Sequence, residues 1–266
     1  MGDRLQDKVA LIVGGGTGFG LACTTRFAEE GARVLVAGRR ADVAEAVAKE
    51  HGGTAATCDV TDDDSVQALV ATTLDRYGRI DAAISFAGYQ QAVPLRDLTP
   101  DILEPMVDVQ FLGALYFMRH VANAMADNGG GSLINVSSTT AHNPVAGHIA
   151  YAASKAGIEY ATRVAALEYG PDQVRVNCIA PHLIETEMTK DIFAMKLPIE
   201  AVRCQTPLGR MGTPADIANC ALWLASDEAN YVSGQIIAID GANSTQKLPT
   251  TSDYEMLARL QPELLE

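Results

Sequence analysis

Residues 8–20 read KVALIVGGGTGFG, and the order of residue types in this stretch decides the fold. The apolar, β-branched run from Lys8 to Val13 predicts a strand buried on both faces, as in a parallel sheet. Helical spacing then predicts a helix from Gly18 to Glu30 that closes at Gly31. The glycines between strand and helix would let backbone N–H groups approach a pyrophosphate at the positive end of the helix. A plain glycine turn is the alternative, because a glycine cluster alone is a weak signal.

Strand-like and helix-like segments alternate along the rest of the chain. Further strands are expected at 33–37, 54–58, 80–85, 132–137, 174–179 and 235–239, and further helices at 42–50, 62–77, 101–126, 151–169 and 214–225. This alternation predicts an α/β fold: a doubly wound, Rossmann-type, mostly parallel sheet of seven strands flanked by helices. We expect a single domain over residues 1–244 and a C-terminal tail over 245–266, with a short helix at 253–260.

One segment is longer than an ordinary connection. Residues 181–207 contain no clear strand or helix pattern, and irregular stretches of this length more often carry function than merely connect elements. Their apolar members are Met188, Ile192, Phe193, Met195 and Leu197. We therefore expect residues 182–207 to form a lid over a substrate.

Charge and cysteine content exclude several classes of function. The 266 residues contain 20 Lys and Arg against 33 Asp and Glu, a net charge of −13, which disfavours binding to nucleic acid or to an anionic membrane. The five cysteines are odd in number and form no C-x-x-C pair, so neither a disulfide framework nor a zinc site is indicated. No apolar run approaches the length of a membrane span. We expect a cytoplasmic protein.

Two arginines follow the second predicted strand. Many dinucleotide folds carry at this place an acidic residue that binds the ribose 2′-hydroxyl, but here the strand ends in Arg39 and Arg40. A guanidinium can form two charge-assisted hydrogen bonds with a 2′-phosphate. The two arginines therefore favour NADP(H) over NAD(H), and NAD(H) remains an alternative cofactor. The simpler interpretation is that both arginines are solvated and bind no ligand.

Tyr151 and Lys155 are four residues apart and share one face of a predicted helix. A nearby ammonium favours the phenolate form, which would bring the pKa of Tyr151 toward neutrality and fit it for proton transfer. Ser138 ends a predicted strand at the edge where open α/β sheets bind ligands, and its hydroxyl could orient a carbonyl oxygen. Either feature alone is common: Tyr and Lys often lie at this interval, and a serine often caps a turn.

Taken together, these residues resemble the short-chain dehydrogenase/reductase family, and its 3-oxoacyl-carrier-protein reductase-like members in particular, from about Leu5 to Ala242. The matching motifs are Gly14-xxx-Gly18-x-Gly20, Cys58-Asp59-Val60, Ala87-Gly88, Ser138, Tyr151-xxx-Lys155, Asn177 with Ala180-Pro181, Thr186 and Asp240-Gly241. The resemblance implies that Tyr151 is the general acid/base and that Ser138 positions the carbonyl. It also implies that Lys155 tunes Tyr151 and holds the nicotinamide ribose.

The cofactor site is expected to combine the glycine turn, the arginines and the residues that the resemblance adds. These are Gly14, Gly16, Thr17, Gly18, Phe19, Gly20, Arg39, Arg40, Asp59, Val60, Ala87, Gly88, Tyr151, Lys155, Pro181, Ile184 and Thr186. Asp59 and Val60 would lie along the adenine, Ala87 and Gly88 along the adjacent ribose, and Ile184 and Thr186 at the carboxamide.

The chain departs from the family pattern at four places. Val13 replaces the threonine before the first glycine, and Phe86 interrupts the motif after the fourth strand. Gln110 stands where members carry a catalytic asparagine, and we count it with the catalytic set. His182 replaces the glycine after Pro181. These changes leave open a catalytically quiet protein that binds NADP(H), although Ser138, Tyr151 and Lys155 are intact.

The expected activity is the interconversion of a secondary alcohol and a ketone on a moderately hydrophobic small molecule. The residues expected to contact the substrate are Tyr89, His142, Val145, His148, His182, Met188, Ile192 and Phe193. Reduction of a 3-oxoacyl thioester is the alternative within this class. No arrangement of histidines marks a metal site. The family commonly forms tetramers, so we expect a homotetramer.

Overall fold

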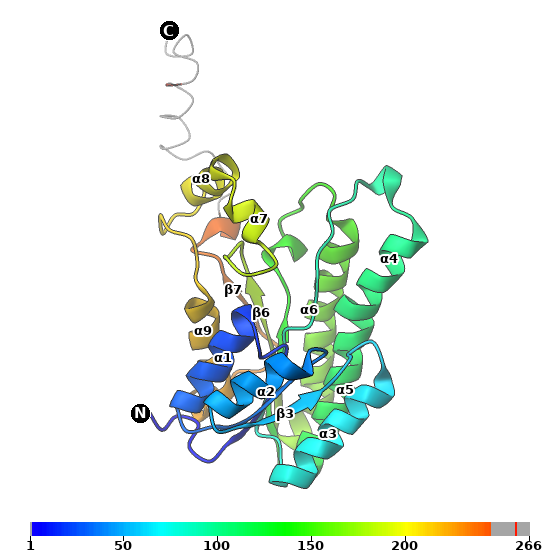
Figure 1. Ribbon diagram of the computed structural model, residues 1–266, viewed down its shortest axis with the longest axis vertical. Coiled ribbons are helices and arrows are strands. Elements are labelled where there is room, and N and C mark those ends of the chain that lie inside the picture. Colours follow the sequence, from blue (N-terminus) through cyan, green and yellow to red (C-terminus); the bar gives the residue numbers. More distant parts are fainter. Residues whose placement is uncertain (1, 246–258, 260–266) are drawn as a thin grey trace.

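The computed structural model describes residues 2–245 and residue 259 (Figure 1). Seven strands form one parallel sheet in the order β3-β2-β1-β4-β5-β6-β7. The strands are β1 (Val9–Val13), β2 (Arg33–Gly38), β3 (Thr54–Thr57), β4 (Ala82–Ser85), β5 (Gly131–Val136), β6 (Val174–Pro181) and β7 (Ile236–Ile239). The order reverses between β1 and β4, which places a ligand-binding crevice at the carboxyl ends of these strands. The predicted fold is confirmed.

Nine helices connect the strands within the described residues. They are α1 (Gly18–Glu29), α2 (Ala41–Glu50), α3 (Asp63–Tyr77), α4 (Pro100–Val107), α5 (Gly113–Asp127), α6 (Ile149–Tyr169), α7 (Lys190–Phe193), α8 (Lys196–Cys204) and α9 (Pro214–Ala225). Most agree with the predicted ranges to within one or two residues. Apart from residue 259, the predicted helix at 253–260 lies outside the described residues.

Two predicted segments differ from the structure. The continuous helix expected at 101–126 is interrupted, because residues 108–112 form a π turn between α4 and α5. Such a turn inserts a residue into the helical repeat, which apolar spacing does not reveal. The segment expected to be irregular contains α7 and α8, two short helices with no buried residue. Exposed ion pairs between Glu187 and Lys190 and between Glu200 and Arg203 bridge neighbouring turns there.

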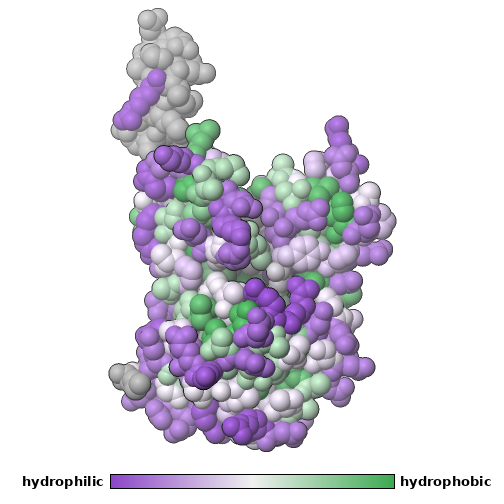
Figure 2. Space-filling model, viewed as in Figure 1, coloured by the Kyte–Doolittle hydropathy of each residue, from purple (hydrophilic) through white to green (hydrophobic). Residues whose placement is uncertain are grey.

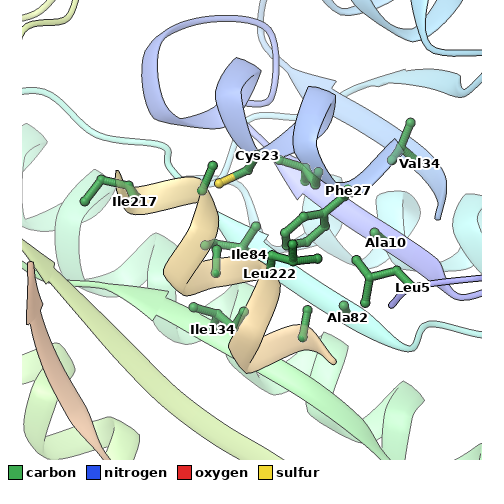
Figure 3. Close-up of a cluster of buried hydrophobic side chains, with 14 of the residues drawn as sticks. Leu5, Ala10, Cys23, Phe27, Val34, Ala82, Ile84, Ile134, Ile217 and Leu222 are labelled. Carbon is green, nitrogen blue, oxygen red and sulfur yellow. The ribbon is translucent and has the colours of Figure 1, made fainter. Parts of the chain in front are cut away.

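Both faces of the sheet are buried beneath helices. On one face, Ile12, Val36 and Ile84 pack against α1, α2 and α9, and Phe27 and Leu222 lie in the same cluster (Figure 3). On the other face, the alternate strand residues, such as Leu11 and Leu35, pack against α3, α5 and α6. Since successive side chains of a strand point to opposite faces, a parallel strand covered on both sides must be apolar throughout. All five residues of β1 are buried.

The glycine turn after β1 is held by backbone packing. A Cβ atom on Gly20 would lie 2.0 Å from the carbonyl oxygen of Gly14, so no larger residue fits there. Gly14 itself has a φ of 72°, in the region that glycine tolerates best. The buried Thr24 hydroxyl of α1 donates to the carbonyl of Gly15 at 3.0 Å. A hydroxyl from the helix therefore holds the turn, although Val13 provides none from the strand.

The described helices include none with both the length and the apolar character that crossing a bilayer requires.

Candidate active site

A cavity of about 1430 Å³ lies at the carboxyl ends of β1, β4, β5 and β6. Figure 2 shows the surface hollowed between the part that carries α7 and α8 and the part that carries α4. Sites for one drug-sized ligand commonly measure roughly 300–1,000 Å³. This cavity is larger, and so has room for a dinucleotide together with a small substrate.

The glycine turn forms one end of the cavity. Gly14, Gly16, Thr17, Gly18 and Phe19 all line it. The first turn of α1 contains no acidic residue, and the Thr17 side chain does not cap the helix. The backbone N–H groups at this end are therefore left to an anion, so the turn fits the pyrophosphate of a dinucleotide.

Gly20 is not among the residues that line the cavity. Its role is the close approach to the Gly14 carbonyl that shapes the turn.

Arg39, Arg40, Asp59 and Val60 line the cavity beside the glycine turn. Both arginines are exposed, and within residues 2–245 neither forms an ion pair. Hydrogen bonds from the Thr61 backbone and hydroxyl lower the pKa of Asp59, to which the charge of Arg39 adds. Two exposed guanidiniums at the rim, neither in an ion pair within residues 2–245, are the right chemistry for a phosphate dianion.

Ser138, Tyr151 and Lys155 meet at the other end of the cavity. Ser138 follows β5 and caps a short turn, since its Oγ accepts from the backbone N–H of Thr140 at 3.2 Å. The first turns of α6 carry Tyr151 and Lys155 on one face, with Nζ of Lys155 5.6 Å from the centroid of the Tyr151 ring. The predicted grouping of hydroxyl, phenol and ammonium is thus present.

The expected lowering of the Tyr151 pKa by Lys155 is wrong. Burial raises the pKa of Tyr151 above its usual value, and the Ser138 hydroxyl only partly offsets this. Burial also lowers the pKa of Lys155 to about 8. Its Nζ donates to the carbonyl of Val136 at 2.8 Å rather than to the phenol. Desolvation therefore acts against both charged forms and outweighs their attraction.

Gln110 lies in the π turn, buried, and lines the cavity. Its Nε2 donates to the carbonyl of Tyr89, while Oε1 is buried without a hydrogen-bond partner among the described residues. The turn thus brings an amide to the cavity with an acceptor that no described residue satisfies.

A buried carboxylate holds the Ser138 loop to α6. Glu159 is 3% exposed, and its Oε1 accepts from the Ser137 hydroxyl at 2.7 Å. Its Oε2 lies 2.7 Å from Nε2 of His142. One side chain of α6 therefore fixes residues on both sides of Ser138. Sequence reasoning missed Glu159, although an acidic residue one turn after Lys155 on the same helix face was the available signal.

Most of the expected substrate contacts do line the cavity: Tyr89, Val145, His148, His182, Met188 and Ile192. Two do not. His142 contacts Glu159 instead, with its Nε2 2.7 Å from Oε2, and is not among the residues that line the cavity. Phe193 follows Ile192 in α7, and neighbours in a helix point about 100° apart, so only Ile192 faces inward.

All the other expected cofactor residues line the cavity: Ala87, Gly88, Pro181, Ile184 and Thr186. Sequence reasoning missed several more that line it, among them Gln90, Asn143, Leu183, Gln205 and Asn243. They lie in loops without a motif, so no sequence signal marks them. Within the part of the chain that the structure describes, no three His, Cys, Asp or Glu residues gather as metal ligands.

Comparison with known proteins agrees with this geometry. The family model described as "Enoyl-(Acyl carrier protein) reductase" matches residues 14–242. The 3-oxoacyl-(acyl-carrier-protein) reductase FabG of Thermotoga maritima is 37% identical over 246 residues, 90% of this chain and 98% of its own. The mitochondrial borneol dehydrogenase of Lavandula x intermedia is 33% identical over 91% of this chain and 92% of its own.

Solved structures give the same result. A short-chain type dehydrogenase/reductase from Mycobacterium ulcerans superposes with a TM-score of 0.88 at 30% identity, covering 96% of both chains. Levodione reductase gives 0.87 at 29% identity, over 92% of this chain and 100% of its own. Fold, site and relatives together define an NAD(P)-dependent oxidoreductase that acts on CH–OH groups. The chain belongs to the short-chain dehydrogenase/reductase family.

Proposed function

We propose that this protein interconverts ketones and secondary alcohols on moderately hydrophobic small molecules, with NADP(H) as its cofactor. The observation that carries the proposal is the meeting of Ser138, Tyr151 and Lys155 on a cavity that has room for both cofactor and substrate. The cofactor supplies or accepts the hydride. Ser138 orients the substrate oxygen, Tyr151 gives or takes the proton on that oxygen, and Lys155 holds the ribose.

The test is a panel of free ketones and alcohols with NADPH and NADP⁺, followed by absorbance of the reduced nicotinamide. We expect turnover of cyclic and aromatic ketones. An enzyme that binds NADPH tightly and is inert across the panel would support instead a catalytically quiet NADP(H)-binding protein. The intact Ser138, Tyr151 and Lys155 argue against that second reading.

The preference for NADP(H) rests on Arg39 and Arg40 at the rim of the cavity. Arg39→Ala should weaken NADPH binding by about tenfold or more, because a hydrogen bond to a charged group contributes roughly 1.5–3 kcal/mol. NADH binding should change little. Exposed Arg96→Ala, which lies outside the cavity lining, is the matched control. Equal losses for both cofactors would remove the argument for NADP(H).

Reduction of a 3-oxoacyl thioester is the alternative, supported by the 37% identity to a 3-oxoacyl-carrier-protein reductase. Acyl-carrier protein is acidic, and a chain of net charge −13 would need a local basic surface to receive it. An acetoacetyl thioester separates the two readings. Efficient turnover of the thioester with no activity on free ketones would favour the alternative.

We further propose a homotetramer in the cytoplasm. Tyr160 and Leu167 on α6 are 70% and 81% exposed, and apolar side chains this exposed are suited to a subunit interface. The five cysteines are all unpaired, in keeping with a reducing compartment. Sedimentation at micromolar protein should give the tetramer, and a monomer would contradict this.

A further inference from the structure

Three buried polar atoms have no hydrogen-bond partner among the described residues. They are Nε2 of Gln90, Oε1 of Gln110 and Nε2 of His182. All three residues line the same cavity. Leaving a buried polar group unpaired costs free energy, so such groups are rare unless something binds them. The Gln110 oxygen belongs to the catalytic end already described, whereas the Gln90 and His182 nitrogens have no part in the proposed proton and hydride transfer.

His182 is held by one contact of its backbone and one contact of its ring. Its backbone N–H donates to the carbonyl of Ile239 at 3.1 Å, which continues the pairing of β6 with β7. Its Nδ1 lies 2.9 Å from the hydroxyl of Thr139, a buried residue next to Ser138. Because Nδ1 is engaged, Nε2 on the opposite side of the ring is the atom left for a ligand. His182 is thus held by the residue that follows Ser138, and Nε2 is the ring nitrogen with no partner among the described residues.

Burial of the His182 ring favours its neutral form. Burial lowers the pKa of His182, and Asp240 counteracts this only in part. A neutral imidazole offers one hydrogen bond and no charge. It therefore suits a hydroxyl or carbonyl oxygen better than a carboxylate or a phosphate.

Gln90 belongs to the segment on the other side of the Ser138 segment. The strand order β4-β5-β6 places the segment after β4, which contains Gln90, opposite the segment after β6, which contains His182, with Ser138 after β5 between them. The same segment is tied down where Gln110 donates to Tyr89 and where the Val93 N–H donates to Gly147 at 2.8 Å. Two nitrogens with no hydrogen-bond partner among the described residues therefore lie in the segments on either side of the one that contains Ser138.

We propose that Nε2 of His182, assisted by Nε2 of Gln90, binds a second, neutral oxygen of the substrate close to its reacting carbon. The preferred substrates are then hydroxyketones, diones and diols rather than simple ketones and alcohols. This inference rests on the proposed ketone–alcohol activity and narrows its substrate class.

A matched pair of substrates tests the inference. The ratio of kcat/KM for 2-hydroxycyclohexanone to that for cyclohexanone measures the value of the second oxygen, since the ring and the reacting carbonyl are otherwise alike. We expect the wild-type ratio to exceed one by about tenfold or more, because a site built to hydrogen-bond an oxygen discriminates against a molecule that lacks it.

Two variants of His182 separate the nitrogen that faces the cavity from the one that faces Thr139. His182→Asn places an amide near the position of Nδ1 and removes the group at Nε2, so it should lose most of the preference for the hydroxyketone. His182→Gln reaches the position of Nε2 and should retain part of it. Gln90→Leu should lower the ratio by a smaller factor, with exposed Gln67→Leu as its matched control.

The outcomes distinguish this inference from the proposed function. Turnover of both ketones with a ratio near one in wild type, or an unchanged ratio in His182→Asn, would overturn the inference and leave the ketone–alcohol activity standing. No turnover of either ketone, or of any other free ketone, would overturn both. A high ratio that falls in His182→Asn and partly returns in His182→Gln would support both.

Discussion

The two ends of the cavity are built in different ways. At the cofactor end, the chain is packed backbone against backbone, and a single added carbon on Gly20 would lie 2.0 Å from Gly14. At the substrate end, α7 and α8 bury no residue, and Leu197 and Leu208 are 81% and 68% exposed. The cofactor end therefore allows almost no substitution, because the shape of its backbone forms the binding site. The substrate end tolerates substitutions, because its exposed side chains determine which substrate fits.

The largest expected effect tests the tightness of the cofactor end. Gly20→Ala should lower the free energy of unfolding by about 3 kcal/mol, since the new methyl group meets backbone that cannot move aside. NADPH binding should be lost with it, because the turn must open. Chemical denaturation and fluorescence titration measure the two effects. Gly170→Ala, where an added Cβ meets nothing within 4 Å, is the control and should be near neutral.

The next prediction concerns Lys155, which is expected to contact both the cofactor and the catalytic Tyr151. Its pKa of about 8 lies below the ordinary 10.5, so between these values the unfolded chain binds more protons than the folded one. The ligand-free protein should therefore gain stability as pH rises from about 8 toward 10.5, by at most about 3 kcal/mol. Thermal unfolding across this range should show the gain in wild type and in exposed Lys49→Met, but not in Lys155→Met.

If the stability of wild type and that of Lys155→Met change with pH in the same way, Lys155 is not desolvated in the folded protein. The catalytic end of the cavity would then be as open to water as the segment that carries α7 and α8.

A third prediction tests whether Glu159 fixes the Ser138 loop. Glu159→Ala removes the nearest acceptor of the buried Ser137 hydroxyl, leaves only the longer contact with the Lys155 carbonyl at 3.3 Å and a marginal one with that of Ser138, and should cost about 1 kcal/mol of unfolding free energy. The kcat for ketone reduction should fall as well, because Ser138 follows Ser137. Glu168→Ala, exposed on the same helix, provides the control. If the two variants are equally stable and equally active, the carboxylate does not position the loop.

The smallest effect is expected at the substrate end. Leu197→Ser in α8 should change the free energy of unfolding by no more than about 0.5 kcal/mol, because its side chain is 81% exposed. Urea denaturation measures this directly. A loss above about 1 kcal/mol would show that α8 is packed as firmly as the glycine turn, and the contrast between the two ends would fail.

The sequence predicted well whatever depends on local pattern. Apolar runs and helical spacing gave the seven strands, and the glycine turn, Tyr151 and Lys155 were found because their spacing is short and fixed by one helix or turn. Contacts between distant segments could not be predicted this way. His142 was expected to contact the substrate, because the residues around it in the sequence do not show that it contacts Glu159 on α6.

The same limit explains the remaining errors. The π turn that contains Gln110 does not alter apolar spacing, and α7 and α8 bury no apolar face that could reveal them. The raised pKa of Tyr151 depends on how fully the folded chain excludes water, which residue spacing does not describe.

The most direct test of the account is the activity of Tyr151→Phe. This variant removes one hydroxyl from a buried ring and should retain NADPH affinity and stability. Its kcat for ketone reduction should fall by about 10²–10⁴-fold, the usual contribution of a positioned proton donor. A variant that binds NADPH normally and reduces ketones at the wild-type rate would contradict the account, because the proton would then come from elsewhere.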